Sequence, residues 1–120
     1  MNWYIAKLIF RIVCGEGHHT PQFDEQLWLV SANDSDEAIA KARQHGKREE
    51  SSLPEDKNDF VKWTFIDVAE LQPIKRLEDG VALYSRVEET EDPAGYIDYI
   101  SWKTQSISQA PGHVTFATIA

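Results

Sequence analysis

Apolar residues recur at every second position along the first stretch of the chain, Trp3–Cys14. Its even positions are all apolar, whereas its odd positions mix apolar side chains with Lys7 and Arg11. An alternation of period two is typical of a β-strand, and a wholly apolar face opposite a mixed face indicates an antiparallel sheet. The length of this stretch favours a central position in the sheet. The even parity places Leu8 and Phe10 in the core.

A second strand and a helix follow a loop. Residues 15–21 contain two glycines and a proline and interrupt the alternation, and a second strand is predicted over Asp24–Ala32. The apolar period then changes from that of a strand to that of a helix. The Asp34 carboxylate can accept hydrogen bonds from the free amides of the next turn, and Glu37 can reach back to the Asp34 amide. This capping box predicts a helix that begins at Ser35.

The predicted helix carries small side chains along one side, which would let its axis lie close to the sheet. These positions are Ala38, Ile39, Ala42 and Gly46. Lys47 and Arg48 suit the negative, C-terminal end of a helix dipole. The helix is therefore expected to end near these cations, before a polar loop over residues 51–59.

Two further strands are expected after this loop. Phe60–Leu71 is rich in aromatic and β-branched residues, and its better-buried parity switches between Phe65 and Ile66, which predicts a bulge there. Pro73 is expected to end this strand, and Asp79-Gly80 to turn the chain. A fourth strand is predicted at residues 81–87, with inward-facing side chains at Val81, Leu83 and Val87.

A second, short helix is predicted after Asp92-Pro93, where a capping residue precedes a proline at the first helical position. Residues 1–103 are then a single domain and residues 104–120 a C-terminal tail, in which Val114, Phe116 and Ile119 allow either a weak strand or a loose end. The predicted fold class is α+β in two layers. Its four-stranded, mainly antiparallel sheet has the strand order 2-1-3-4, and the main helix lies on one face.

Composition adds limits on partners and location. The chain has 120 residues, enough for one domain with a sizeable core, and a formal net charge of -8. An acidic surface repels phosphate groups, so neither nucleic acid nor an anionic membrane is an expected partner. Cys14 is the only cysteine, which excludes an internal disulfide and favours the cytoplasm. Lys7 and Arg11 interrupt any signal-like apolar region, and no membrane-spanning run is present.

Several short segments, in this order, resemble the bacterial family called domain of unknown function 4288. They are Trp3–Leu8, Phe23–Leu27, Asp79-Gly80, Leu83–Arg86 and Tyr96–Tyr99. The resemblance covers about residues 2–103 and leaves out the tail. It implies a bacterial, stand-alone, intracellular protein, and it carries over no activity, substrate or catalytic residue.

Metal-ligating residue types are densest around the first loop. Cys14, His18 and His19 lie there with Glu16 and Asp24, but their spacing matches no known metal site, and adjacent loop histidines point in different directions. Cys14 also has the parity of the core, where free cysteines are common. We therefore expect a buried cysteine beside two solvated histidines, with no structural metal and no cofactor.

Catalytic residues are not expected either. A cysteine nucleophile needs an exposed thiolate held near an imidazole, which a core position would not provide. His45 and His113 are explained by capping or solvation. The acidic residues at 88–92 lead into a predicted helix, where they complement its dipole. The sequence thus leans away from an enzyme.

The odd positions of the first strand define a second surface, which we call the outer face, as opposed to the helix face that carries Leu8 and Phe10. The candidate binding residues on the outer face are Trp3, Ile5, Lys7, Ile9, Arg11, Lys62, Tyr84 and Arg86, joined by one side of the Leu27–Leu29 segment. Its cations can pair across strands with Glu25 or Glu70, but its apolar side chains still need cover.

Three kinds of cover remain open from the sequence: the second helix or the tail, a second copy or other protein partner, and a small anionic ligand. We interpret the chain as a non-catalytic binding domain of unknown biological role that self-associates through the outer face. The alternative is a small enzyme or anion-binding protein with a pocket on that face. An inhibitor of cationic toxins is a further alternative, based on composition alone.

Overall fold

The computed structural model describes residues 1–52 and 61–109. Its elements are β1 (Asn2–Cys14), β2 (Gln22–Ala32), α1 (Ser35–Ser52), β3 (Val61–Ile74) and α2 (Pro93–Gln109). The chain divides into two compact units, Met1–Ser85 and Arg86–Ala120. The first unit contains the sheet and α1, and the second contains α2.

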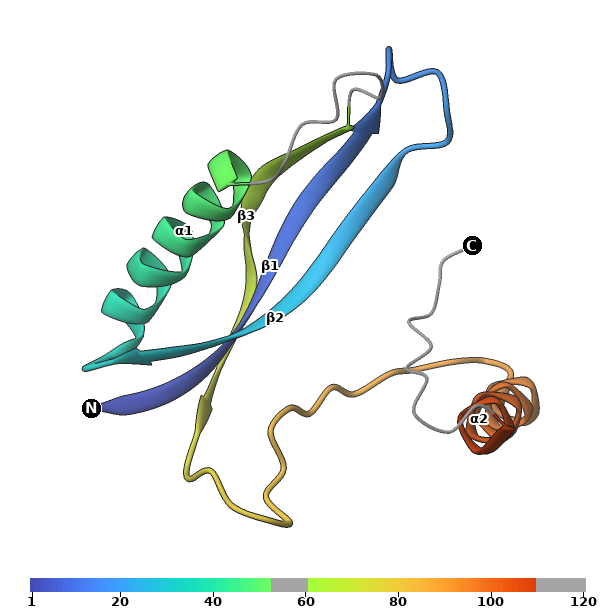
Figure 1. Cartoon of the computed structure of the whole chain (residues 1–120). Helices are drawn as coiled ribbons and strands as arrows, with labels where there is room; N and C mark the ends of the chain where they lie inside the picture. Colours follow the sequence, from blue (N-terminus) through green and yellow to red (C-terminus); the bar gives the residue numbers. More distant parts are fainter. Residues whose placement is uncertain (53–60, 110–120) are drawn as a thin grey trace. The chain divides into compact units, whose positions relative to one another are not determined.

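The first unit is an α+β structure with a three-stranded antiparallel sheet. The strand order is β2-β1-β3, so β1 is the central strand, as its length and alternation predict. Helix α1 lies along one face of this sheet (Figure 1). The predicted fold class and the central position of the first strand are therefore confirmed.

The hydrophobic core lies between the helix face and α1. Ala6, Leu8 and Phe10 are fully buried there, as are Ala38 and Ala42 of α1. The small side chains allow the close approach of helix and sheet that the sequence predicts. The approach is closest at Gly46, where a Cβ atom would collide with the Phe65 ring. The Phe65 ring in turn packs against Phe10, with ring centroids 5.5 Å apart.

The N-terminus of α1 forms at the predicted place, with one difference in its cap. Asp34 Oδ1 accepts a hydrogen bond of 2.8 Å from the Glu37 amide, as expected. Glu37 Oε2, however, accepts from the amide of Asn33, at 3.3 Å, rather than from that of Asp34. At the other end, α1 passes Lys47 and Arg48 and continues to Ser52, two residues into the predicted loop.

Strand β3 is irregular where the sequence predicts a bulge. Its register against β1 shifts between Ile9 and Phe10, which leaves Ile66 without a partner and confirms the bulge next to Phe65. A second shift, between Lys7 and Leu8, leaves out Ala69 in the same way. Each bulge adds one unpaired residue to β3 and so changes which parity of the strand faces α1. Val68 and Leu71 therefore still pack against the core.

Pro73 does not end β3, contrary to the sequence prediction. It lies inside the strand opposite Tyr4, and Ile74 is still paired with Trp3. A proline is tolerated in an edge strand, where its missing N–H need not serve a neighbouring strand, and β3 is an edge strand of this sheet.

The predicted fourth strand is also wrong. Residues 81–87 have no regular secondary structure, so the described sheet has three strands and the order 2-1-3-4 does not form. Leu83 and Val87, expected to face inward, are 44% and 88% exposed. The chain here contacts β3 through side-chain groups of β3 rather than through a backbone ladder, and the bulges and Pro73 make β3 a poor template for another strand.

In the second unit, α2 begins at Pro93 as predicted. The Asp92 side chain accepts a hydrogen bond of 3.1 Å from the Gly95 amide and thereby caps the helix. The helix is longer than expected, since it passes Thr104 and ends at Gln109. The remainder of the predicted tail, with Val114, Phe116 and Ile119, lies outside the described residues.

Candidate functional site

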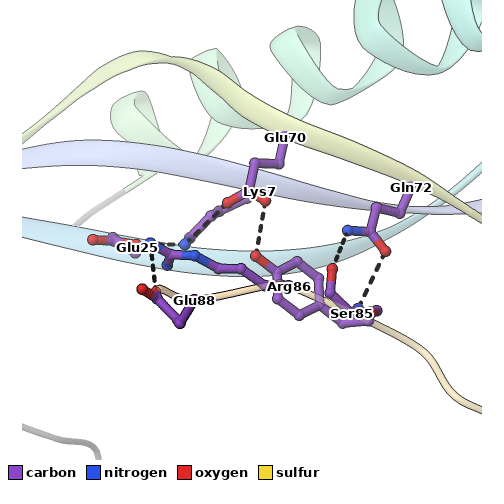
Figure 2. Close-up of polar contacts among 8 residues, drawn as sticks. Lys7, Glu25, Glu70, Gln72, Ser85, Arg86 and Glu88 are labelled. Atoms are coloured by element: carbon purple, nitrogen blue, oxygen red, sulfur yellow. Dashed lines mark hydrogen bonds and ion pairs between the residues drawn. The ribbon is translucent and has the colours of Figure 1, made fainter. Parts of the chain in front are cut away.

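The centre of the outer face is a cluster of charged side chains drawn from all three strands. Lys7 of β1 lies between Glu25 of β2 and Glu70 of β3, on the side of the sheet away from α1 (Figure 2). Its Nζ is 2.7 Å from Glu25 Oε1 and 3.3 Å from Glu70 Oε2. The cation at this centre is therefore neutralised within the fold.

The pKa of Lys7 reflects this pairing. The hydrogen bond to Glu25 raises the pKa above its ordinary value, and Glu70 acts in the same direction, whereas burial alone would lower it. Only 15% of the Lys7 side chain is exposed. Lys7 thus remains charged and engaged at neutral pH.

Residues 84 and 85 lie against the β3 side of the outer face. The Tyr84 hydroxyl donates a hydrogen bond of 2.8 Å to Glu70 Oε1. Gln72 binds the backbone of Ser85 twice: its Nε2 donates to the Ser85 carbonyl at 2.9 Å, and its Oε1 accepts from the Ser85 amide at 3.3 Å (Figure 2). This part of the outer face is consequently covered by the chain itself.

The β2 side of the outer face is different, because large apolar side chains are exposed there. Phe23 and Leu27 are each 54% exposed and Leu29 is 48% exposed, and Trp3 of β1 is 40% exposed. Arg11 lies over the Phe23 ring, with its guanidinium carbon 5.8 Å from the ring centroid. We call Trp3, Phe23, Leu27 and Leu29 the apolar row.

The structure brings most of the predicted surface residues together on one face. Ile5 and Ile9 are half-buried on either side of Lys7 along β1, and Lys62 is exposed opposite Val13. Arg86 belongs to the second unit, where its guanidinium pairs with Glu88 at 2.9 Å.

Sequence reasoning missed Phe23 and Gln72 as residues of this face, whereas the predicted cross-strand pairing of a cation with Glu25 and Glu70 is found at Lys7. Phe23 has the same parity as Leu27 and Leu29. A predicted second strand that began at Gln22 rather than Asp24 would therefore have placed Phe23 on this face. The role of Gln72 has no such signal, because it depends on where the chain passes after β3.

The loop between β1 and β2 corrects the prediction for Cys14. This residue is exposed rather than buried, because the β1–β2 turn projects beyond the end of α1 and the helix does not cover it (Figure 1). His19 has a structural role in the turn: its Nε2 accepts from the Cys14 amide at 3.0 Å, while its Nδ1 lies 2.8 Å from the Thr20 carbonyl. Both ring nitrogens of His19 are therefore engaged.

On the helix side of the sheet, the side chains of Asp67 and His45 have a shifted pKa, and their contacts explain both shifts. Arg43 Nε donates a hydrogen bond of 2.9 Å to Asp67 Oδ1, which lowers the pKa of the Asp67 carboxyl. The hydrogen bond that the Val68 amide donates to the same oxygen lowers this pKa further. Burial lowers the pKa of His45, whose ring stacks on Trp28 with centroids 5.5 Å apart. Each of these groups lies where α1 meets the sheet.

Within residues 1–52 and 61–109, no three His, Cys, Asp or Glu side chains are grouped so that they could hold a metal ion. None of the described helices is long and apolar enough to cross a membrane.

A family model described as "Domain of unknown function (DUF4288)" matches residues 3–85. The chain belongs to this family. The matched residues of the DUF4288 domain coincide closely with the first structural unit, Met1–Ser85, and therefore include the sheet, α1 and the apolar row. Helix α2, with the Tyr96–Tyr99 segment that contributes to the resemblance, lies outside the matched residues. No curated protein and no solved structure matches the DUF4288 chain.

Proposed function

We propose that this protein is a non-catalytic binding domain that self-associates through the outer face of its sheet. The observation that carries this proposal is the apolar row, in which four large side chains on one face are between 40% and 54% exposed. Contiguous apolar patches on a protein surface mark sites of association, because their burial releases water from apolar area.

The charged cluster supports a protein surface over a small anion as the occupant of this face. Lys7, the cation at the centre of this face, is already bound by Glu25 and Glu70, so a small anion would have to be held by the peripheral cations Arg11 and Lys62. The same pairing supports binding rather than proton transfer, since these groups hold one another instead of converging on a cavity.

We also propose that the protein works in the bacterial cytoplasm. The support is the resemblance to a bacterial family and the exposed, free thiol of Cys14, which is better preserved in a reducing compartment.

The proposal is tested by placing charge in the apolar row. We expect the unmodified protein to be a dimer in light scattering at about 100 μM, well above a typical dimer dissociation constant. Trp3→Asp combined with Leu29→Asp should shift it to a monomer with an unchanged far-UV circular dichroism spectrum, because both side chains are already partly exposed.

Leu77→Asp is the matched control, since Leu77 is 49% exposed but lies after the end of β3, outside the apolar row. This control should remain dimeric. A monomeric unmodified protein at that concentration would overturn self-association, and loss of the dimer in the control would show that charge alone, not the apolar row, is responsible.

A further inference from the structure

The two edges of the sheet differ in how they are protected. All 11 residues of β2 pair with β1 in unbroken antiparallel register. On its other side, β2 has no strand partner among the described residues. Such a strand presents a row of backbone N–H and C=O groups that can pair with another strand.

The opposite edge, β3, carries the features that prevent such pairing. Its register is broken twice, Pro73 removes one N–H, and Gln72 holds Ser85 against this side of the unit. Bulges and prolines are the devices by which natural proteins block edge-to-edge association. The contrast singles out β2 as the unprotected edge.

The charged residues of β2 do not protect its edge either. They are Asp24 and Glu25, and both are bound within the same sheet. Glu25 is held by Lys7 on the outer face. On the helix face, Asp24 Oδ2 accepts from Gln26 Nε2 at 2.6 Å and from Trp63 Nε1 at 3.2 Å. Neither carboxylate is left as a free charge that would repel an approaching strand.

We propose that β2 pairs with β2 of a second copy, antiparallel and around a two-fold axis at Leu27, to form a continuous six-stranded sheet. This inference rests on the proposed self-association and specifies its geometry. A two-fold axis perpendicular to the sheet leaves both outer faces on the same side, so the β2 members of the two apolar rows lie side by side across the joined edge and partly cover one another.

The sequence of β2 fits this register. Leu27 faces the second copy's Leu27. Leu29 faces the second copy's Glu25 and lies diagonal to that copy's Leu27 and Phe23, within reach of large side chains. Asp24 and Glu25 face the second copy's Val30 and Leu29, so no acidic residue faces an acidic residue of the other copy, and Glu25 is paired with Lys7 of its own sheet. A leucine pair at the axis with no like charges facing each other is compatible with a self-complementary strand.

The pairing is tested at the residue on the axis, where a substitution meets its own copy. Leu27→Lys and Leu27→Glu should each weaken dimerisation more than tenfold, because two like charges then face each other. An equimolar mixture of the two variants should restore the dimer, because unlike charges then meet. Ile66→Lys is the matched control: Ile66 is 52% exposed, close to the 54% of Leu27, but belongs to the bulge of β3.

Amide hydrogen exchange provides a backbone measurement. In the dimer, the β2 amides that do not bond to β1 should exchange more slowly than in dilute, monomeric protein, since they become bonded to the second copy. Failure of the mixture to restore the dimer, or identical exchange of these amides in monomer and dimer, would overturn the pairing while leaving self-association through the apolar row in place. A monomeric unmodified protein would overturn both.

Discussion

The helix face and the outer face of the sheet are formed by alternate residues of the same strands, yet they differ in what they contact. On the helix face, Ala6, Leu8 and Phe10 are fully buried against α1. On the outer face, their neighbours surround a paired lysine, and the apolar row on the β2 side is exposed.

This difference separates the residues that stabilise the fold from those available for association. Since the core cluster that packs against α1 lies on the helix face and the residues of the exposed row on β2 are not part of it, the row can be altered with little loss of stability. The two faces should therefore respond differently to the same substitution.

The most severe test replaces one leucine on each face with aspartate. Leu8→Asp buries an unpaired carboxylate at a fully buried position and should cost several kcal/mol of a total stability of about 5 to 15 kcal/mol, which unfolds the domain. Leu27→Asp, on the exposed row, should leave the thermal melt of the monomer near that of the parent. Similar melting temperatures for the two variants, measured by circular dichroism, would mean that the faces are not distinguished as described.

A smaller effect is expected where the helix approaches the sheet most closely. Gly46→Ala places a methyl group against the Phe65 ring. Overpacking costs about 1 to 3 kcal/mol, offset by about 1 kcal/mol gained from the higher helix propensity of alanine. We expect a net loss of stability in urea unfolding. Gln44→Ala, at an exposed position of α1, is the control and should not destabilise. A more stable Gly46→Ala protein would contradict the close approach.

The smallest effect depends on pH, at the contact of α1 with β2. Burial, with the charges of Arg48 and Lys41, lowers the pKa of His45 in the folded state. The stability that depends on neutral His45 is present above the unfolded pKa of about 6.5 and is lost as pH falls through the lower folded pKa.

His45→Gln should therefore reduce the loss of stability that the parent shows between about pH 7 and pH 5, in urea unfolding followed by tryptophan fluorescence. Gln44→Ala, at an exposed position of α1 next to His45, should keep the parent's pH dependence. An unchanged pH dependence in the His45 variant would show that this histidine does not report on the helix–sheet contact.

The sequence was sufficient to predict the features set by local patterns. The alternation in β1, the capping box at Asp34 and the parity switch at Phe65 each involve residues close together in the chain. Their consequences, a central strand, the start of α1 and a bulge, are all found.

The predictions that failed concern features that depend on contacts between distant segments of the chain. Cys14 has the parity of the core, but its burial depends on how far α1 reaches along the sheet. The predictions for Pro73 and for residues 81–87 were based on residue propensity. The outcome of both depends instead on β3 being an edge strand, which tolerates a proline and has no further strand beside it in the described sheet. For the candidate site, the faces could be assigned from parity, but the exposure of the apolar row required the register between strands.

The double hydrogen bond between Gln72 and Ser85 has a consequence for assembly. A side-chain amide offers one donor and one acceptor, as a peptide group does, so Gln72 satisfies the Ser85 backbone without a further strand. Together with the two bulges and Pro73, this contact disfavours a further strand on the β3 side. An assembly unit with a single open edge is monovalent: pairing through β2 would consume that edge and stop at two copies, whereas a sheet open on both sides could continue into a fibre.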